Sequence, residues 1–230
     1  MMIKMTRQIL FGFDHSHLCV VPGSSAWLHK DVIAPLSALC AKASEAGFDL
    51  VVASGFRSVE KQTDIWNGKV RGERPVLNSD GQPIDTRKLT DWELLQAILR
   101  WSALPGASRH HWGTDFDIYD KRCLPAGYRL QLTVEECEPG GVFAAFYEWF
   151  SPLIDSDQAN GFFRPYAIDY GGVSREPWHL SYRPLADEFC AALSIDALAE
   201  IVEQSEMLYK DLVLKKLPEI YQCYVLNRPS

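Results

Sequence analysis

The sequence predicts an α+β protein in which residues 1–230 form one domain. Short runs of strand character, such as residues 48–53 and 114–119, are mixed with longer amphipathic stretches that have the period of a helix. The two kinds of segment do not alternate regularly, as they do in a protein built from βαβ units. No internal repeat, low-complexity run or Gly/Ser-rich linker divides the chain. These observations favour a single mixed domain over a doubly wound parallel sheet.

The first predicted helix follows Ser24 and Ser25 and ends at Gly47, with apolar residues at helical spacing between them. Pro35 lies inside this stretch and is expected to kink or split the helix. Residues 48–53, which are mostly apolar, are then expected to form a strand.

Capping residues and turn residues delimit the remaining elements. In chain order we expect a helix at 59–70 capped by Ser58, a surface loop at 71–88, a helix at 91–103 opened by Thr90 with Glu93 at capping-box spacing, a strand at 114–119, an excursion at 120–139, a helix at 140–154, strand-like segments at 162–170 and 178–182, and helices from 184 to about 223 with breaks near Ser194 and Pro218.

Composition excludes several classes of protein. The chain is 47% hydrophobic and 23% charged, which is typical of a folded protein and excludes a disordered chain, a collagen-like repeat and a coiled coil. The net charge of −7 disfavours a nucleic-acid partner, because such proteins usually carry a basic face. No run of 18 apolar residues is present, so no membrane-spanning segment is expected. The sequence carries no prediction of oligomeric state.

None of the six cysteines has the CxxC spacing of a zinc ribbon or a thioredoxin-type redox pair. Near the N-terminus, the apolar run Ile9–Phe13 is too short for the apolar region of a signal peptide. We therefore expect a cytoplasmic protein with reduced cysteines.

Three short segments are dense in polar and reactive side chains: residues 54–62, 108–117 and 176–179. Among them, His110, Asp117 and His179 supply two imidazoles and one carboxylate, a donor set that binds catalytic zinc and leaves a fourth position for water. Glu176 lies three residues before His179, where a carboxylate can take a proton from that water.

These segments resemble the motifs of a known family. Residues 108–117, SRHHWGTDFD, are similar to the SxHxxGxxxD motif of zinc D-Ala-D-Ala carboxypeptidases and dipeptidases. Residues 176–179, EPWH, are similar to their ExxH motif, and residues 54–62, SGFRSVEKQ, to their SGxRS…Q segment. The same group includes lysostaphin-type peptidases and the zinc fold of hedgehog domains. The motifs occur in family order over residues 54–179, slightly more than half of the chain.

The resemblance implies a small central antiparallel sheet flanked by helices. Residues from about 184 to 230, whose pattern is helical, are expected to be an extension of this domain. It implies one zinc ion per chain and a peptidoglycan-derived peptide as substrate. The implied roles are zinc ligation by His110, Asp117 and His179, general base catalysis by Glu176, oxyanion stabilisation by Arg57, and substrate binding or orientation by Ser108 and Gln62. His111 is expected to be a neighbour of the site, and Trp112 and Trp178 to be packing residues that wall it.

One position departs from the family pattern. Asp115 occupies a place where the family usually has a small residue, often Ala. In a strand, residues 115 and 117 face the same side of the sheet, so Asp115 either competes for the metal or lies beside it as a hydrogen-bond acceptor. Its negative charge favours a metal and opposes an anionic substrate, which leaves the choice of substrate open.

The expected activity is that of a D-Ala-D-Ala carboxypeptidase. Two alternatives remain: an L-Ala-D-Glu endopeptidase of the phage type, which uses the same chemistry, and a non-catalytic zinc-stabilised binding module of the hedgehog type. Glu176 and Arg57 are both present, which favours an enzyme over the binding module. Because no signal peptide is seen, the expected enzyme either handles cytosolic wall fragments or is released by another route.

Overall fold

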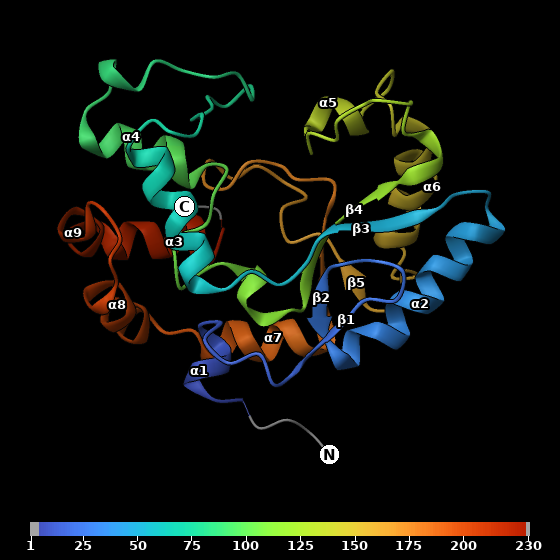
Figure 1. Ribbon diagram of the computed structural model, residues 1–230, viewed down its shortest axis with the longest axis horizontal. Helices are drawn as coiled ribbons and strands as arrows, with labels where there is room; N and C mark the ends of the chain where they lie inside the picture. Colours follow the sequence, from blue (N-terminus) through green and yellow to red (C-terminus); the bar gives the residue numbers. More distant parts are fainter. Residues whose placement is uncertain (1–4, 229–230) are drawn as a thin grey trace.

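The computed structural model describes residues 5–228 and shows a four-stranded antiparallel sheet surrounded by helices, together with a separate two-stranded hairpin (Figure 1). The sheet is small and central, as expected for the α+β class. The strands are β1 (Leu18–Val20), β2 (Trp27–His29), β3 (Leu50–Ser54), β4 (Asp115–Asp120), β5 (Phe162–Phe163) and β6 (His179–Tyr182). The helices are α1 (Arg7–Leu10), α2 (Lys30–Glu45), α3 (Val59–Val70), α4 (Asp91–Leu99), α5 (Val134–Cys137), α6 (Ala144–Asp155), α7 (Arg183–Ala192), α8 (Ile195–Gln204) and α9 (Lys210–Ile220). Shorter turns are η1 (Thr86–Lys88), η2 (Arg109–Trp112), η3 (Lys121–Cys123) and η4 (Tyr221–Val225).

The strand order β3-β4-β6-β5 makes β4 and β6 central neighbours. Side chains alternate between the two faces of a strand, so β4 divides its residues by chemistry. Phe116 and Ile118 point to one face and are fully buried, whereas Asp115 and Asp117 belong to the other. The sequence of β4 therefore gives the sheet one apolar face and one polar face.

Two apolar clusters hold the fold together. The first packs the apolar face of the sheet against α2 and α6, through residues such as Leu39 and Phe146. The second joins α3, α4, α8 and α9 around Trp66 and Leu95. Figure 1 shows the two groups on opposite sides of the molecule, with α3, α4, α8 and α9 on one side and α2, α6, β3 and β4 on the other. No helix among residues 5–228 is long and apolar enough to cross a membrane.

Local capping signals were reliable guides to helix starts. Ser58 accepts a hydrogen bond from the Lys61 backbone and begins α3, and Thr90 forms the expected capping box with Glu93 at the start of α4. Ser194 likewise caps α8, which confirms the expected break between two helices at this point.

The structure corrects three expectations about boundaries. The helix expected after Ser25 begins only at Lys30, because residues 27–29 pair with β1. Pro35 does not split α2, which runs unbroken from Lys30 to Glu45; the hydrogen bond that the proline cannot make belongs to the second turn of the helix. The strand expected at 162–170 is reduced to Phe162–Phe163.

The C-terminal helices divide at a different place from the one expected. Helix α9 passes through Pro218 and continues to Ile220, where buried Leu217 and Ile220 keep this turn against the second cluster. The chain breaks instead between α8 and α9, around Tyr209, which has a left-handed backbone conformation.

Candidate functional site

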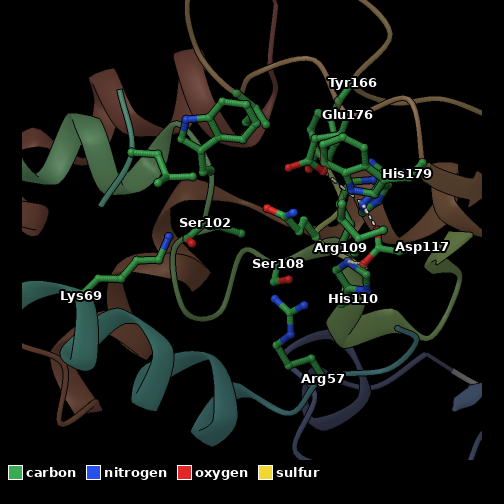
Figure 2. Close-up of a pocket in the computed structure, with 17 residues that line it drawn as sticks. Arg57, Lys69, Ser102, Ser108, Arg109, His110, Asp117, Tyr166, Glu176 and His179 are labelled. Atoms are coloured by element: carbon green, nitrogen blue, oxygen red, sulfur yellow. Dashed lines mark ion pairs between the residues drawn. The ribbon is translucent and has the colours of Figure 1, made fainter. Parts of the chain in front are cut away.

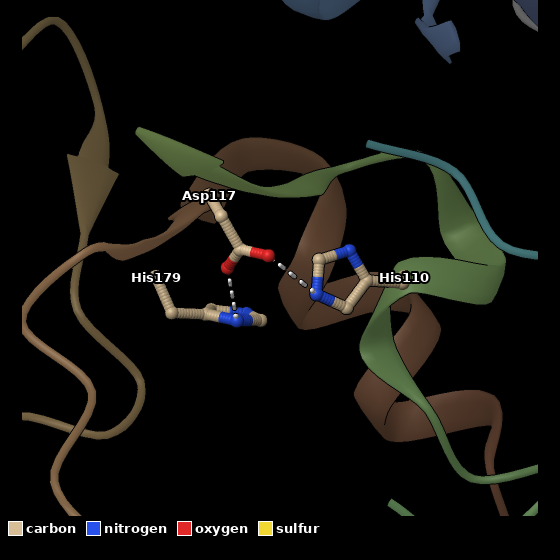
Figure 3. Close-up of side chains that lie close together, drawn as sticks. All are labelled: His110, Asp117 and His179. Carbon is tan, nitrogen blue, oxygen red and sulfur yellow. Dashed lines mark ion pairs between the residues drawn. The ribbon is translucent and has the colours of Figure 1, made fainter. Parts of the chain in front are cut away.

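Strand pairing brings two of the expected zinc ligands together. Asp117 in β4 lies directly opposite His179 in β6, and Asp115 lies opposite Ser181 one pleat further on. Directly paired residues project to the same face, so these four polar side chains share the polar face of the sheet. His110 approaches the same point from η2, and one ligand atom from each of His110, Asp117 and His179 lies within 4.8 Å of the others (Figure 3).

A glycine places η2 against the hairpin. Gly113 ends the turn with φ +69°, and a Cβ there would lie 2.5 Å from the side chain of Leu18 and 2.9 Å from the backbone nitrogen of His29. Both the backbone conformation and the close approach therefore require glycine at this position. This gives a physical reason for the glycine in the segment 108–117.

Hydrogen bonds orient both imidazoles. His110 Nδ1 lies 2.8 Å from the Gly55 carbonyl, and His179 Nε2 lies 3.1 Å from Asp115 Oδ1. A ring nitrogen that faces such an acceptor carries the hydrogen, so the other nitrogen of each ring is left with a free lone pair. These other nitrogens face Asp117, at 3.7 Å for His110 Nε2 and 3.4 Å for His179 Nδ1.

The donor set fits a zinc ion. Asp117 Oδ1 is buried and has no hydrogen-bond partner among residues 5–228, and it faces the free nitrogen of His179. Two neutral imidazole nitrogens and a carboxylate oxygen are the ligands of catalytic zinc sites. Burial also keeps His110 neutral, since it lowers the pKa of that side chain to about 3. The arrangement therefore offers three ligand atoms that converge on one point. Burial lowers the pKa of His179, but contacts with Asp115, Asp117 and Glu176 outweigh burial and raise this pKa well above its usual range, so zinc binding would displace a proton from this ring.

Asp115 is held away from the ligand positions. Its Oδ1 accepts a hydrogen bond from Arg109 Nε at 2.7 Å, and its Oδ2 accepts from Thr114 at 2.7 Å and from Ser181 at 3.0 Å. Asp115 is fully buried, and burial alone raises a carboxyl pKa, but Arg109 and the hydrogen bond with His179 outweigh burial and lower the pKa of Asp115. Of the two roles expected for Asp115, the structure shows the one beside the ligand His179.

Glu176 lies next to the same histidine. Its Oε2 is 3.4 Å from His179 Nδ1, and its side chain is 15% exposed. Burial raises the pKa of Glu176, although contact with His179 works against this. The backbone of Glu176 donates to the Tyr166 carbonyl at 3.0 Å, which fixes the start of the turn leading into β6. A carboxylate is thus held at the edge of the proposed metal position.

Arg57 approaches from the opposite side of the site. Its backbone N–H donates to the His110 carbonyl at 3.1 Å, and its guanidinium donates to Gln62 Oε1 at 2.8 Å. His111 donates through Nδ1 to the Arg57 carbonyl at 2.6 Å and accepts from the Gly106 backbone through Nε2. His111 is a neighbour that positions the site, as expected.

A cavity of about 270 Å³ lies over these groups (Figure 2). Arg57, Ser108, His110, Asp117, Glu176 and His179 all line it, and so does Trp178. Gln62 is the exception among the expected site residues: it is fully buried, and its amide bridges Arg57 and the Ala103 carbonyl. We interpret Gln62 as a residue that positions Arg57.

Several residues that line the cavity were not predicted from the sequence: Lys69, Leu77, Trp101, Ser102, Gln131, Leu132, Tyr166 and Val173. Only Lys69 had a usable signal, because it lies seven positions after Gln62 and so on the same side of a predicted helix. Leu77, Gln131 and Leu132 come from segments expected to be surface elaborations.

Known proteins and one family model match parts of this chain. A family model described as VanY, D-alanyl-D-alanine carboxypeptidase, matches residues 25–185, which is more than half of the chain. An uncharacterised protein of Haemophilus influenzae is 41% identical over 105 residues, 44% of this chain and 72% of that protein. A D-alanyl-D-alanine carboxypeptidase of Enterococcus faecalis is 28% identical over 135 residues, 57% of this chain and 39% of that enzyme.

Two solved structures share the fold. One is VanYB in complex with D-alanine-D-alanine, with a TM-score of 0.51 and 23% identity, covering 82% of this chain and 89% of that one. The other is a vancomycin-resistance D,D-pentapeptidase VanY variant in complex with Zn(II), with a TM-score of 0.50 and 24% identity, covering 80% and 92%.

Proposed function

The chain belongs to the VanY family of D-alanyl-D-alanine carboxypeptidases, and from this premise we propose that it is a zinc-dependent peptidase that releases the C-terminal residue of peptidoglycan-type peptides ending in D-Ala-D-Ala. The observation that carries the proposal is the convergence of His110, Asp117 and His179 on one point, with Glu176 beside it. Three protein ligands leave the fourth position of a zinc ion open for water, and the adjacent carboxylate supplies a proton acceptor.

The three ligands would hold one zinc ion per chain. Bound there, zinc supplies two things: it lowers the pKa of a water molecule towards neutrality, and it polarises a carbonyl group. His110 and His179 contribute their free nitrogens, whose orientation is set by Gly55 and Asp115. We assign Asp115 the role of a positioning residue, because it acts on the site through His179.

Glu176 moves the proton. Its carboxylate accepts a proton from the attacking water as the new C–O bond forms, and returns it to the leaving amine as the C–N bond breaks. Its raised pKa suits both halves of this task better than that of an exposed carboxylate does. The hydrolysis then needs no other acid or base.

Arg57 stabilises the developing negative charge on the scissile carbonyl oxygen. Burial lowers the pKa of Arg57, but a guanidinium still keeps its proton at neutral pH. The hydrogen bond to Gln62 holds the guanidinium group of Arg57 in place before substrate binds. Little reorganisation is therefore needed when the negative charge develops. We assign a substrate contact to Ser108, which lines the cavity beside Arg57.

The test compares the wild-type protein with Glu176→Ala on defined muropeptides, with mass analysis of the products. We expect Glu176→Ala to retain zinc and to lose about 10²- to 10⁴-fold in turnover. Glu188→Ala, at an exposed position on α7, is the matched control and should keep full activity. Hydrolysis by Glu176→Ala at the wild-type rate would overturn the mechanism.

The products also separate the alternatives. Loss of one D-Ala supports the carboxypeptidase, whereas cleavage between L-Ala and D-Glu would identify an endopeptidase of the phage type. Stoichiometric zinc without cleavage of any of these peptides would indicate a binding module.

A further inference from the structure

One wall of the cavity carries a cation that the proposed mechanism does not use. Lys69, in the last turn of α3, lines the cavity together with Trp101 and Ser102. Figure 2 shows its side chain reaching towards Ser102, across the cavity from Asp117 and His179. The lysine is thus in the same cavity as the catalytic groups but on a different wall.

Lys69 has no partner of its own in the part of the chain that the structure describes. Its ammonium makes no ion pair and no hydrogen bond with residues 5–228, although a helix C-terminus offers free carbonyl groups nearby. Burying an ammonium without an acceptor is unfavourable, so an unpaired lysine that faces a cavity is suited to an anion that arrives with a ligand.

The charges around Lys69 favour an anion as well. Arg74, just beyond α3, and Arg57, just before it, both act on Lys69 as like charges, and Glu176 is the acid that opposes them. Burial is the largest influence and, together with these arginines, it lowers the pKa of Lys69 to about 8. At neutral pH the side chain is still mostly protonated, and the surrounding cations leave it in need of a counter-ion.

We propose that Lys69 binds a free α-carboxylate on the substrate residue whose amine leaves. This inference rests on the proposed function, and it names the residue that would recognise the carboxylate of the substrate. Arg57 lies just before α3 and Lys69 lies in its last turn, and both line the cavity. Arg57 would therefore meet the oxyanion of the scissile carbonyl, and Lys69 the carboxylate of the departing residue.

Two kinds of substrate carry such a carboxylate. In a peptide ending in D-Ala-D-Ala it is the C-terminus itself. In a peptide linked through the γ-carboxyl of D-Glu, it is the α-carboxylate that the linkage leaves free. The chemistry recognised is the same, and the substrates distinguish the two sources.

The experiment measures kcat/KM for two matched pairs of peptides. The first pair is diacetyl-L-Lys-D-Ala-D-Ala with a free C-terminus and with a C-terminal amide, so that no other carboxylate is present. The second pair is N-acetyl-L-Ala-D-Glu with its γ-carboxyl blocked as an amide, in one member with the α-carboxylate free and in the other with it amidated. The proteins are the zinc-loaded wild type, Lys69→Met, Lys69→Arg, and Lys61→Met, an exposed position on the same helix, as the matched control.

We expect Lys69→Met to lose about 10- to 100-fold on a free acid, the range for a hydrogen bond to a charged group, and nothing on its amide. Lys69→Arg should restore most of the loss, and Lys61→Met should behave as wild type. The pair that shows the loss identifies the source of the carboxylate. An equal loss on acid and amide, or no loss on either pair, overturns the inference.

A binding measurement separates this inference from the proposed function. Calorimetry with D-Ala-D-Ala and its amide reports recognition even in a protein that cuts neither. If no peptide is hydrolysed but Lys69→Met abolishes the preference for the free acid, the proposed function fails and the carboxylate site stands. If hydrolysis proceeds and neither readout depends on Lys69, only the carboxylate site fails.

Discussion

The two sides of the cavity differ in their charges and in how many contacts their side chains make with one another. On the sheet side, Asp117 and His179 line the cavity as a direct cross-strand pair, and the buried side chains of Asp115 and Ser181 lie behind His179 and contact one another. On the helix side, formed by Arg57, Lys69 and Ser102, the charges are positive, and within residues 5–228 neither cation has a carboxylate within ion-pair distance. In the proposed function, this difference separates the groups that would hold a metal from the groups that would bind the substrate.

The comparison teaches where preorganisation is needed. Metal ligands must keep one geometry whether or not substrate is present, so hydrogen bonds and strand register fix them. Substrate-facing cations gain from staying unpaired, because an internal acid would compete with the ligand. The cavity therefore has one side whose groups are fixed by contacts with one another and one side whose two cations have no carboxylate partner among residues 5–228.

The largest effect is expected from breaking the sheet side. Asp117→Ala removes one of three ligands and leaves a cavity between two imidazoles, so we expect bound zinc to fall from about one ion per chain to a small fraction of that. Metal analysis of the purified protein measures this, with a thermal melt as the check on folding. Full zinc occupancy in Asp117→Ala would show that the ligand set is a different one.

Next comes Arg57 on the helix side. Arg57→Met removes the donor to the developing oxyanion, and we expect kcat to fall about 10²- to 10³-fold while zinc content is unchanged. Steady-state kinetics beside metal analysis make the distinction. Loss of zinc in parallel with kcat would place Arg57 among the groups that hold the site together.

A smaller effect on the sheet side is expected from Asp115. Asp115→Asn keeps the size of the side chain but weakens the acceptor for His179 Nε2, and we expect zinc affinity to fall about 10- to 100-fold. Competition with a chelator gives the affinity, and long-range ¹⁵N NMR of the imidazole gives the tautomer of His179. Unchanged affinity and tautomer would reduce Asp115 to a packing role.

The smallest expected effect is a pH dependence on the helix side. Lys69 is charged below its pKa of about 8 and neutral above it, so the ratio of kcat/KM for a free-acid peptide to that for its amide should fall by about 10-fold or less as the pH rises through this value. Taking the ratio cancels the shared contributions of Glu176 and Arg57, which, with Arg74, face the lysine. Lys69→Arg should hold the ratio constant to higher pH. A ratio that stays flat in the wild type would contradict the prediction.

Local signals allowed much of this fold to be predicted. The caps at Ser58, Thr90 and Ser194 act through neighbouring backbone groups, so a short stretch of sequence is enough to find them. The predicted start of α2 was wrong because residues 27–29 pair with β1. This tertiary contact overrides the helical pattern of the sequence.

In the candidate site, too, some residues could be predicted from local sequence and others depend on tertiary contacts. The ligand set and Glu176 were predictable because their spacing reflects local chemistry, and the structure brings them together; their roles stay predictions until tested. The role of Asp115 was left open, since Arg109 and Ser181 decide it and no spacing rule connects them. Lys69 was not predicted, because its place in the cavity wall depends on how α3 packs against α4.

Because Asp117 pairs directly with His179, the site forms only when β4 and β6 are paired in the native register. A slip of β4 by one residue would bring Phe116 or Ile118 opposite His179 and turn both aspartates into the apolar core. Such a misfolded sheet could not bind the ion, so free zinc would stabilise only correctly paired chains, by an amount that grows with the logarithm of its concentration. Zinc that serves the reaction would then also select, among folding chains, those with the native alignment of the sheet.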